Sequence, residues 1–344
     1  MKLKLFLVIL FILAIIGLII FLIIRRKPKE SYKVDIPEED KIDIVITWVD
    51  DTDDFLKEKN DWFNKEKKGT KQYDNPSTIR YKNYEELKYS LRSIEKYFPH
   101  FNNIYLIVKD GQYPKYLKKN IPNLHIVNHS DIIPKEYLPT FNSRAIELYL
   151  HHIPNLSENY LYLNDDFMFL KDTDLSYFMD RNNDIPYHII TNTQISKRDN
   201  KNLNLSSSGF TCGLHFNSNI LDEVTKDEQR FEVSHSPMLY RKSYDKKIED
   251  YFKEYDNNIF DRTASAKFRR CDDLYFVSIL KPYLYKNWYN SQSIKSESLF
   301  ETNFDVNSKN YTNYRFLNLE PINDIQKYKK YMDTLYPEKS SFEL

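Results

Sequence analysis

Short runs of apolar, largely β-branched residues alternate along the chain with segments whose apolar residues recur every three or four positions. The apolar runs predict buried strands at residues 42–49, 104–108, 124–127 and 159–163. The helically spaced segments predict helices at residues 83–97, 142–152 and 243–254. The polar residues 57–79 predict an irregular loop. Because helix and strand alternate, we expect an α/β fold with a mostly parallel sheet and flanking helices.

Two of the predicted strands end directly in carboxylates. The run at 159–163 is followed by Asn164, Asp165 and Asp166, and the run at 42–49 by Asp50, Asp51, Asp53 and Asp54. In an open α/β sheet, ligands bind outside the carboxyl ends of the strands, so we expect these side chains to face a crevice. Adjacent carboxylates are hard oxygen ligands, which makes Asp165 and Asp166 candidate ligands of Mg²⁺ or Mn²⁺. Two alternatives stay open, namely a polar turn after the strand and helix capping by Asp53 and Asp54.

The chain opens with an apolar run of the length that a bilayer-spanning helix needs. Residues 3–24 are almost unbroken apolar sequence and are followed by Arg25, Arg26 and Lys27. The apolar region of a cleaved signal peptide is shorter and ends in small residues. We therefore expect a single-pass membrane protein with an N-terminal transmembrane anchor at residues 1–27 and a stalk at 28–40. Basic residues on both sides of the run leave the side of the membrane open.

Composition argues against several classes of protein. Lys plus Arg (50) balances Asp plus Glu (50), so no overall field favours nucleic acid, and charged partners must be bound locally. From the five glycines neither G-x-G-x-x-G nor G-x-x-x-x-G-K-[ST] can be assembled, which argues against dinucleotide enzymes and P-loop NTPases. Cys212 and Cys271 make no disulfide framework and have no zinc-site spacing.

Four stretches together resemble the conserved regions of the Stealth family of hexose-1-phosphate transferases. That family includes bacterial capsular polysaccharide phosphotransferases and the catalytic subunit of the animal N-acetylglucosamine-1-phosphotransferase. The first stretch is 42–53; the second comprises 86–97, 104–112, 138–147 and 162–166; the third is 235–237; and the fourth is 268–273. The resemblance spans residues 42–285 with a gap at 172–230. This chain departs from the family at Asp51, where glycine is common.

The resemblance implies a Rossmann-like, GT-A-like catalytic domain at residues 41–285. Within it, residues 172–232 would form an α+β insertion on the acceptor side. After it, residues 286–344, which are polar with scattered aromatics, would form a C-terminal extension that wraps the surface. It also implies a phosphotransferase that moves a sugar-1-phosphate, of a hexose or N-acetylhexosamine, from a nucleotide diphosphate sugar to a hydroxyl of a glycan or polysaccharide acceptor. The expected donor is a UDP-sugar, and the nucleoside monophosphate is released.

Residues in the matching stretches suit this reaction, which depends on alignment and charge neutralisation more than on covalent help from the protein. We expect Asp165 and Asp166 to hold the metal, and Arg269 to bind the transferring phosphoryl group. His235 is the expected general base, because imidazole titrates near working pH. The expected cofactor-binding residues are Asp50, Asp51, Asp53, Arg270 and Asp273. Arg270 is also the second choice for the phosphoryl contact, and either Asp272 or Asp273 would orient His235 or complete the metal shell.

Other interpretations stay open. His235 also suits an ordinary loop, and Arg269, Arg270, Asp272 and Asp273 suit the first turn of a helix. Ordinary loop or helix-face positions are expected for His125, His129, His151 and His152. The alternative functions are a metal-dependent GT-A-type glycosyltransferase that transfers the sugar alone, and a non-catalytic glycan-binding module. The expected partners are a nucleotide sugar, a glycan acceptor and the membrane, but no nucleic acid.

Overall fold

A five-stranded sheet with the strand order β10-β4-β1-β2-β3 lies at the centre of the protein, whose structure is a computed structural model. The structure describes residues 42–67, 81–195, 209–225, 229–255, 258–301, 311–319, 322 and 324–344. The strands of this sheet are β1 (Asp43–Thr47), β2 (Ile104–Val108), β3 (Leu124–Asn128), β4 (Asn159–Asn164) and β10 (Met238–Arg241). β4, β1, β2 and β3 run parallel, and β10 pairs antiparallel with β4 at one edge.

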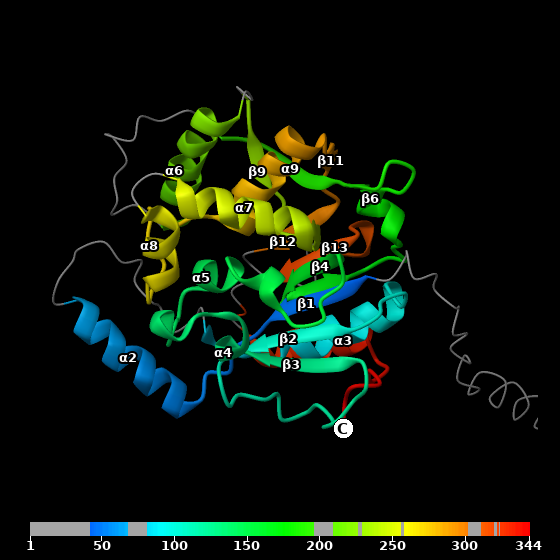
Figure 1. Cartoon of the computed structure of the whole chain (residues 1–344). Helices are drawn as coiled ribbons and strands as arrows, with labels where there is room; N and C mark the ends of the chain where they lie inside the picture. The colour runs from blue at the N-terminus through cyan, green and yellow to red at the C-terminus, as the bar shows by residue number, and fades with distance from the viewer. Residues whose placement is uncertain are drawn as a thin grey trace, which may run out of the picture. The chain divides into compact units, whose positions relative to one another are not determined.

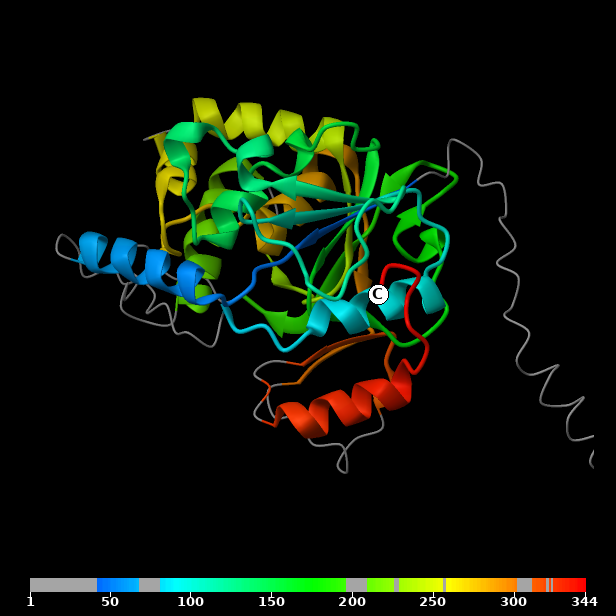
Figure 2. The same cartoon turned by 90° about the horizontal axis from the view of Figure 1, so that it is seen from below.

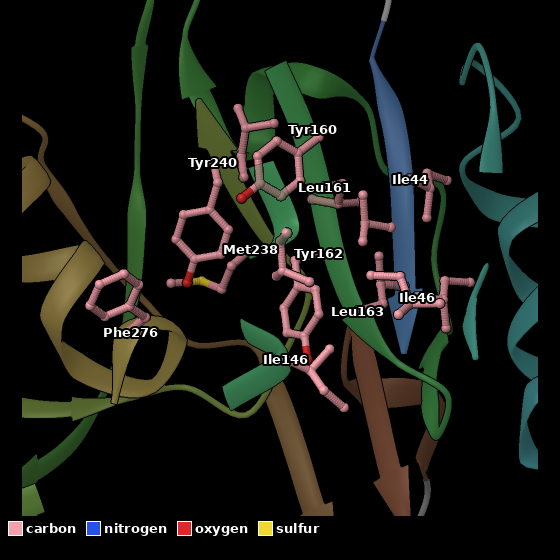
Figure 3. Packing of buried hydrophobic residues seen from close by; sticks show 14 of the residues in the cluster. Ile44, Ile46, Ile146, Tyr160, Leu161, Tyr162, Leu163, Met238, Tyr240 and Phe276 are labelled. Carbon is pink, nitrogen blue, oxygen red and sulfur yellow. The ribbon is translucent and has the colours of Figure 1, made fainter. Parts of the chain in front are cut away.

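The sequences of the central strands explain why they are buried. A parallel sheet is covered by helices on both faces, so its strands are apolar on both sides. β2 is buried along its whole length, and Ile44, Val45 and Ile46 of β1 have no exposed surface. Figure 3 shows Tyr160 of β4 beside Tyr240 of β10, and Tyr162 of β4 beside Met238, within the largest cluster of buried residues. The sheet therefore forms a rigid base from which the loops at its ends project.

Helices cover both faces of this sheet (Figures 1 and 2). The helices of the described residues are α2 (Asp53–Lys67), α3 (Glu86–Tyr97), α4 (His129–Ile132), α5 (Ser143–Glu147), α6 (Gly209–Val224), α7 (Lys242–Glu254), α8 (Ile259–Ser265), α9 (Lys281–Tyr289) and α10 (Ile325–Leu335). Of these, α2 extends away from the sheet. Figure 2 shows α7 on one side of the sheet and α3 on the other, with α10 beyond α3. Leu87, Leu91 and Ile94 of α3 recur at helical spacing and are buried in the core. α3 ends at Tyr97, because residue 99 is a proline that disfavours helical geometry before it.

Three smaller sheets surround the central one. They are β11 (Ser293–Lys295) with β8 (His188–Gln194) and β9 (Phe231–Val233); β12 (Ser298–Glu301) with β13 (Phe316–Leu319) and β5 (Phe167–Phe169); and β6 (Met179–Asp180) with β7 (Ile185–Pro186). The pairing of β13 with β5 matters for the site, because β5 begins directly after Asp166. A second cluster of buried residues, including Met168, Leu317, Tyr89, Tyr328 and Met332, joins β5 and β13 to α3 and α10.

The predicted α/β architecture with a mostly parallel sheet is confirmed, and each of the four predicted strands is present. Three local predictions differ from the structure. Residues 57–67 continue helix α2 instead of forming a loop, since Phe55 and Lys59 lie one turn apart and are both buried. The predicted helix at 142–152 is divided into α5 and a 3₁₀ turn at Leu150–His152. The segment after residue 286 has buried residues of its own, and does not merely cover the surface.

The prediction of a single-pass membrane protein is corrected. A bilayer crossing needs about 20 consecutive apolar residues in a helix, and no helix among the described residues combines that length with sufficient apolar content. The predicted anchor at 1–27 and stalk at 28–40 lie outside the described residues.

Candidate functional site

The carboxyl ends of β1 and β4 lie side by side and define one edge of the central sheet. Thr47, the last residue of β1, is paired with Asn164, the last residue of β4. The buried Tyr162 hydroxyl is 3.2 Å from Thr47 Oγ1 and donates to Asn164 Oδ1 at 3.1 Å. Because both strands end at this edge, the carboxylates that follow them emerge on the same side of the sheet, as the sequence predicted.

Asp165 and Asp166 form the turn that joins β4 to β5. The carboxylate oxygen Oδ1 of Asp166 is buried and has no hydrogen-bond partner within the described part of the chain. Burial raises the pKa of Asp166 to about 6, although a hydrogen bond from Asn318 acts in the opposite direction. An unpartnered buried carboxylate oxygen is costly, and a divalent cation is the kind of group that satisfies it. The turn therefore fits the predicted metal ligands in both residue type and environment.

His235 lies against this turn. β10 runs antiparallel to β4 with Met238 opposite Tyr162, so the segment just before β10 approaches the end of β4. The exposed His235 ring makes an edge-to-face contact with Phe167, and the ring centroids are 4.7 Å apart. The predicted general base therefore contacts Phe167, the residue that directly follows the predicted metal ligands Asp165 and Asp166.

Arg269 approaches the same edge from the segment that follows α8. Its Nη2 donates to Ser143 Oγ of α5 at 2.7 Å. Burial raises the pKa of Tyr162 well above its usual value, and the positive charge of Arg269 acts in the opposite direction, so this guanidinium lies near the end of β4. Glu147 on α5 is also buried near Arg269. Burial raises the pKa of Glu147, and the positive charge of Arg269 opposes that shift. We conclude that Arg269 reaches the edge defined by β1 and β4.

Arg270 makes different contacts. Its guanidinium donates to both carboxylate oxygens of Asp272, at 3.0 and 2.9 Å, and Arg262 also donates to Asp272, at 2.8 Å. A forked pair of this kind fixes the direction of the guanidinium. Arg270 is thus held by Asp272 in this structure.

Asp273 is held inside the protein, with 1% of its surface exposed. Its Oδ2 accepts hydrogen bonds from the backbone nitrogen of Arg270 at 2.7 Å and from Asn142 Nδ2 at 3.0 Å, and it lies 3.5 Å from Arg144 Nη1. Burial raises its pKa to about 6. These contacts of Asp273 attach α5 to the loop that contains Arg269. Asp273 therefore helps to position this loop.

The carboxylates after β1 occupy three different environments. Asp50 is fixed by neighbouring loops: its backbone N–H donates to Gln112 Oε1 at 3.0 Å, and its Oδ1 accepts from Asn83 Nδ2 at 2.9 Å. Asp51 is half-buried, and Asp53 is exposed in the first turn of α2. Asp53 thus lies in the first turn, where a carboxylate is favoured by the helix dipole, while the capping bond of α2 is made by Thr52, whose Oγ1 accepts from the backbone nitrogen of Phe55 at 3.4 Å.

The structure joins Cys212 of α6 to Cys271 in a disulfide, a pairing that the sequence analysis did not predict. Cys271 follows Arg270 directly, so the bond attaches α6 to the loop that carries Arg269. The sequence reasoning also gave no role to several polar residues that hold the site in place, namely Asn83, Gln112, Asn142, Ser143, Arg144, Glu147 and Asn318. Of these, residues 142–147 lie within a stretch that resembles the family. This resemblance was the feature of the sequence that could have identified them.

A second group of possible metal ligands lies elsewhere. Among the described residues, His151, His152 and Glu249 form such a group, with His–Glu distances of 2.8 and 3.0 Å. Both histidines precede β4, so the length of that strand, about 20 Å, separates them from the Asp165–Asp166 turn. Lys253 is 2.7 Å from Glu249, and this cation supplies part of the charge that a metal would supply. This group is a hydrogen-bonded ion cluster away from the predicted site.

Comparisons with known proteins bear on the family to which this chain belongs. A model of conserved region 2 of the Stealth proteins matches residues 80–186. The capsular polysaccharide phosphotransferase LcbA of Neisseria meningitidis is 46% identical over 127 residues, which are 37% of this chain and 34% of that protein. The capsular polysaccharide phosphotransferase WcwK of Streptococcus pneumoniae is 30% identical over 88% of this chain and 98% of that protein.

Among solved structures, galactosyltransferase LgtC in complex with donor and acceptor sugar analogues matches 87% of this chain and 97% of its own, with a TM-score of 0.42 and 12% identity. A similarity of that size carries no argument about this protein. The alignment with WcwK does, because it extends over nearly the whole of both chains. This chain belongs to the Stealth family of phosphotransferases.

Proposed function

We propose that this protein transfers a sugar-1-phosphate from a nucleotide diphosphate sugar, a UDP-sugar by preference, to a hydroxyl group of a glycan acceptor. Two relatives that align with it are named capsular polysaccharide phosphotransferases, which supports a polysaccharide acceptor. The observation that carries the proposal is the contact between His235 and Phe167, the residue that directly follows Asp165 and Asp166 in the chain. A GT-A-like catalytic domain at residues 41–285 is part of the same proposal.

Asp165 and Asp166 are the residues that would hold Mg²⁺ or Mn²⁺. When bound, a divalent cation neutralises the diphosphate oxygens and stabilises the leaving group as a Lewis acid. The unpartnered Oδ1 of Asp166 supports this assignment. The group at His151, His152 and Glu249 does not take this role, because it lies at the other end of β4.

The protein's own side chains align the reacting groups. The acceptor hydroxyl oxygen attacks the phosphorus next to the sugar, the bond from that phosphorus to the bridging oxygen breaks, and the nucleoside monophosphate leaves. The imidazole of His235 takes the proton of the hydroxyl group, a step that contributes about 10²–10⁴-fold in typical enzymes. Arg269 binds the oxygens of the transferring phosphoryl group, while its Nη2 is held by Ser143.

The nucleotide is proposed to bind near the loop after β1. Asp50 is positioned there by Gln112 and Asn83, and Asp51 and Asp53 follow it. Roles in cofactor binding for Arg270 and Asp273 remain predictions. Their contacts with Asp272 and Asn142 support a positioning role for this loop instead.

The products of the reaction test the proposal. The full chain is incubated with a panel of nucleotide sugars and a glycan acceptor, and the products are identified by mass spectrometry. Release of a nucleoside monophosphate with a gain of sugar-phosphate on the acceptor is expected. Release of a nucleoside diphosphate with a gain of sugar alone would instead identify a glycosyltransferase and refute the proposal.

Two substitutions test the assigned residues. Asp166→Asn and His235→Ala should each abolish transfer while circular dichroism and the melting temperature stay close to wild type. The matched controls are the variants Asp172→Asn and His100→Ala, which change exposed residues and should retain activity. Near-wild-type turnover by either site variant would contradict its role.

A further inference from the structure

Two buried oxygen atoms, one in the Asp165–Asp166 turn and one on the neighbouring strand β13, have no hydrogen-bond partner among the described residues. One is Oδ1 of Asp166, and the other is Oδ1 of Asn318, whose side chain is 1% exposed. Leaving a buried polar atom unpaired costs about 1–3 kcal/mol. Two such atoms in neighbouring side chains therefore indicate a group that both of them bind.

Asn318 reaches the turn from a distant part of the chain. It lies on β13, which pairs antiparallel with β5, and it is opposite Phe167, the residue after Asp166. Its Nδ2 donates to the backbone oxygen of Asp166 at 3.4 Å. With the amide nitrogen directed at Asp166, the amide oxygen is the atom left without a partner.

The surroundings of Asn318 argue against a purely structural amide. Its strand neighbours Phe316, Leu317 and Leu319 are all buried and apolar. An amide within such a strand is unfavourable compared with an apolar side chain unless both of its polar atoms are used. The Nδ2 atom of Asn318 donates to Asp166, and its Oδ1 atom needs either a cation or a hydrogen-bond donor.

We propose that Asn318 supplies an oxygen ligand, through Oδ1, to the divalent cation held by Asp165 and Asp166. The inference rests on the metal-dependent transfer proposed above, and it adds a ligand from outside the stretches that resemble the family. Carbonyl and carboxylate oxygens are the ligands that Mg²⁺ and Mn²⁺ prefer. The neutral amide adds a ligand without adding a third negative charge to a turn that already has two.

Binding of Mn²⁺ to the full chain tests the proposal without measuring activity. Free Mn²⁺ is followed by electron paramagnetic resonance, with and without UDP, for the wild type, Asn318→Ala and Asn318→Asp. Asn318→Ala removes the oxygen and should raise the Kd for Mn²⁺ about tenfold or more, whereas Asn318→Asp keeps an oxygen and should bind at least as tightly as wild type. Leu317→Ala in the same strand is the matched control, because it should lower the melting temperature and leave the Kd unchanged.

The outcomes separate this inference from the proposed function. If Asp166→Asn loses Mn²⁺ binding while Asn318→Ala binds as wild type does, Asn318 is not a ligand and the proposed transfer still stands. If Asn318→Ala and Leu317→Ala weaken Mn²⁺ binding equally, the effect comes from destabilisation of β13, and the inference is wrong. If the wild-type chain binds no Mn²⁺ under either condition, both the metal ligands of the proposed function and this inference are refuted.

Discussion

The ion pair between Arg92 and Glu343 permits a quantitative prediction about how the C-terminal segment is held. Arg92 of α3 donates to both carboxylate oxygens of Glu343 at 2.7 Å, and to the backbone oxygen of Tyr336 at 2.8 Å. The two charged side chains are 6% and 3% exposed. Removing one member of a buried pair leaves an uncompensated charge, which typically costs 3–5 kcal/mol.

We expect Glu343→Gln to destabilise the protein by about 3 kcal/mol. The amide keeps the shape of the side chain, but it places an N–H group against a guanidinium N–H group and removes the negative charge. The loss should fall at the low end of the range for buried pairs, because the partly exposed Asp333 remains 3.4 Å from Arg92. For a unit of about 300 residues, an unfolding entropy of about 2.1 cal/mol/K per residue converts this loss into about 5 °C in melting temperature.

Calorimetry and urea unfolding of Glu343→Gln, Arg92→Met and the double variant measure this effect. The exposed Glu338→Gln is the matched control and should change stability by less than about 0.5 kcal/mol. The double variant should be less destabilised than the sum of the single variants, because it leaves no unpaired buried charge. A Glu343→Gln variant as stable as the control would refute the reasoning.

The pH dependence gives an independent check on Glu343. Burial raises its pKa, but hydrogen bonds from Arg92 and Ser340 outweigh burial, so the pKa is lowered below its ordinary value of 4.5. A carboxyl whose pKa is lower in the folded state stabilises the protein above the pKa of the unfolded chain, and this stabilisation is lost as the pH falls. The stability difference between wild type and Glu343→Gln should therefore decrease below about pH 4.5.

Three further predictions concern the site and its surroundings. Arg269→Lys should lower kcat/KM about 10²-fold, since an ammonium cannot bind a phosphoryl group with a planar fork while donating to Ser143; a loss below threefold in steady-state assays would contradict this. Burial lowers the pKa of His129 from 6.5 to about 4. About 3 kcal/mol of stability should therefore be lost as the pH falls from 6.5 to 4. In His129→Gln, the melting temperature should depend less on pH over this range. Replacing Cys212 and Cys271 together by Ser should destabilise the chain by about 4 kcal/mol in the chain-entropy model for a separation of 59 residues, and an unchanged urea midpoint would count against the bond.

Local sequence was sufficient to predict the four parallel strands of the central sheet, although not the antiparallel edge strand β10. Ile44, Val45 and Ile46 form part of a continuous β-branched run because a parallel strand is buried on both faces. The interruption of such a run at Asp165 and Asp166 located the end of a strand without any three-dimensional information. His235 was placed near it only by the family resemblance, since its contact with Phe167 depends on the pairing of β10 with β4.

The features that the sequence did not reveal depend on contacts between distant residues. Asn318 lies on a strand whose partner, β5, is far away in the chain, and no local pattern distinguishes it from other asparagines. The Cys212–Cys271 bond likewise depends on how α6 packs against the loop before α9. Helix α2 was interpreted as a loop because most of its residues are polar, and only its burial of Phe55 and Lys59 shows why it is a helix.

The pairing of β13 with β5 has a consequence for protein synthesis. Asn318 follows Asp166 by 152 residues, so at a translation rate of about 5–20 residues per second the ribosome adds it about 8–30 s after the aspartate. During that interval β5 lacks the strand that it pairs with in the finished protein. A nascent chain therefore already contains the carboxylates, the histidine and the arginine of the site before Asn318 is added, so the contact of β13 with the Asp165–Asp166 turn can form only late in synthesis.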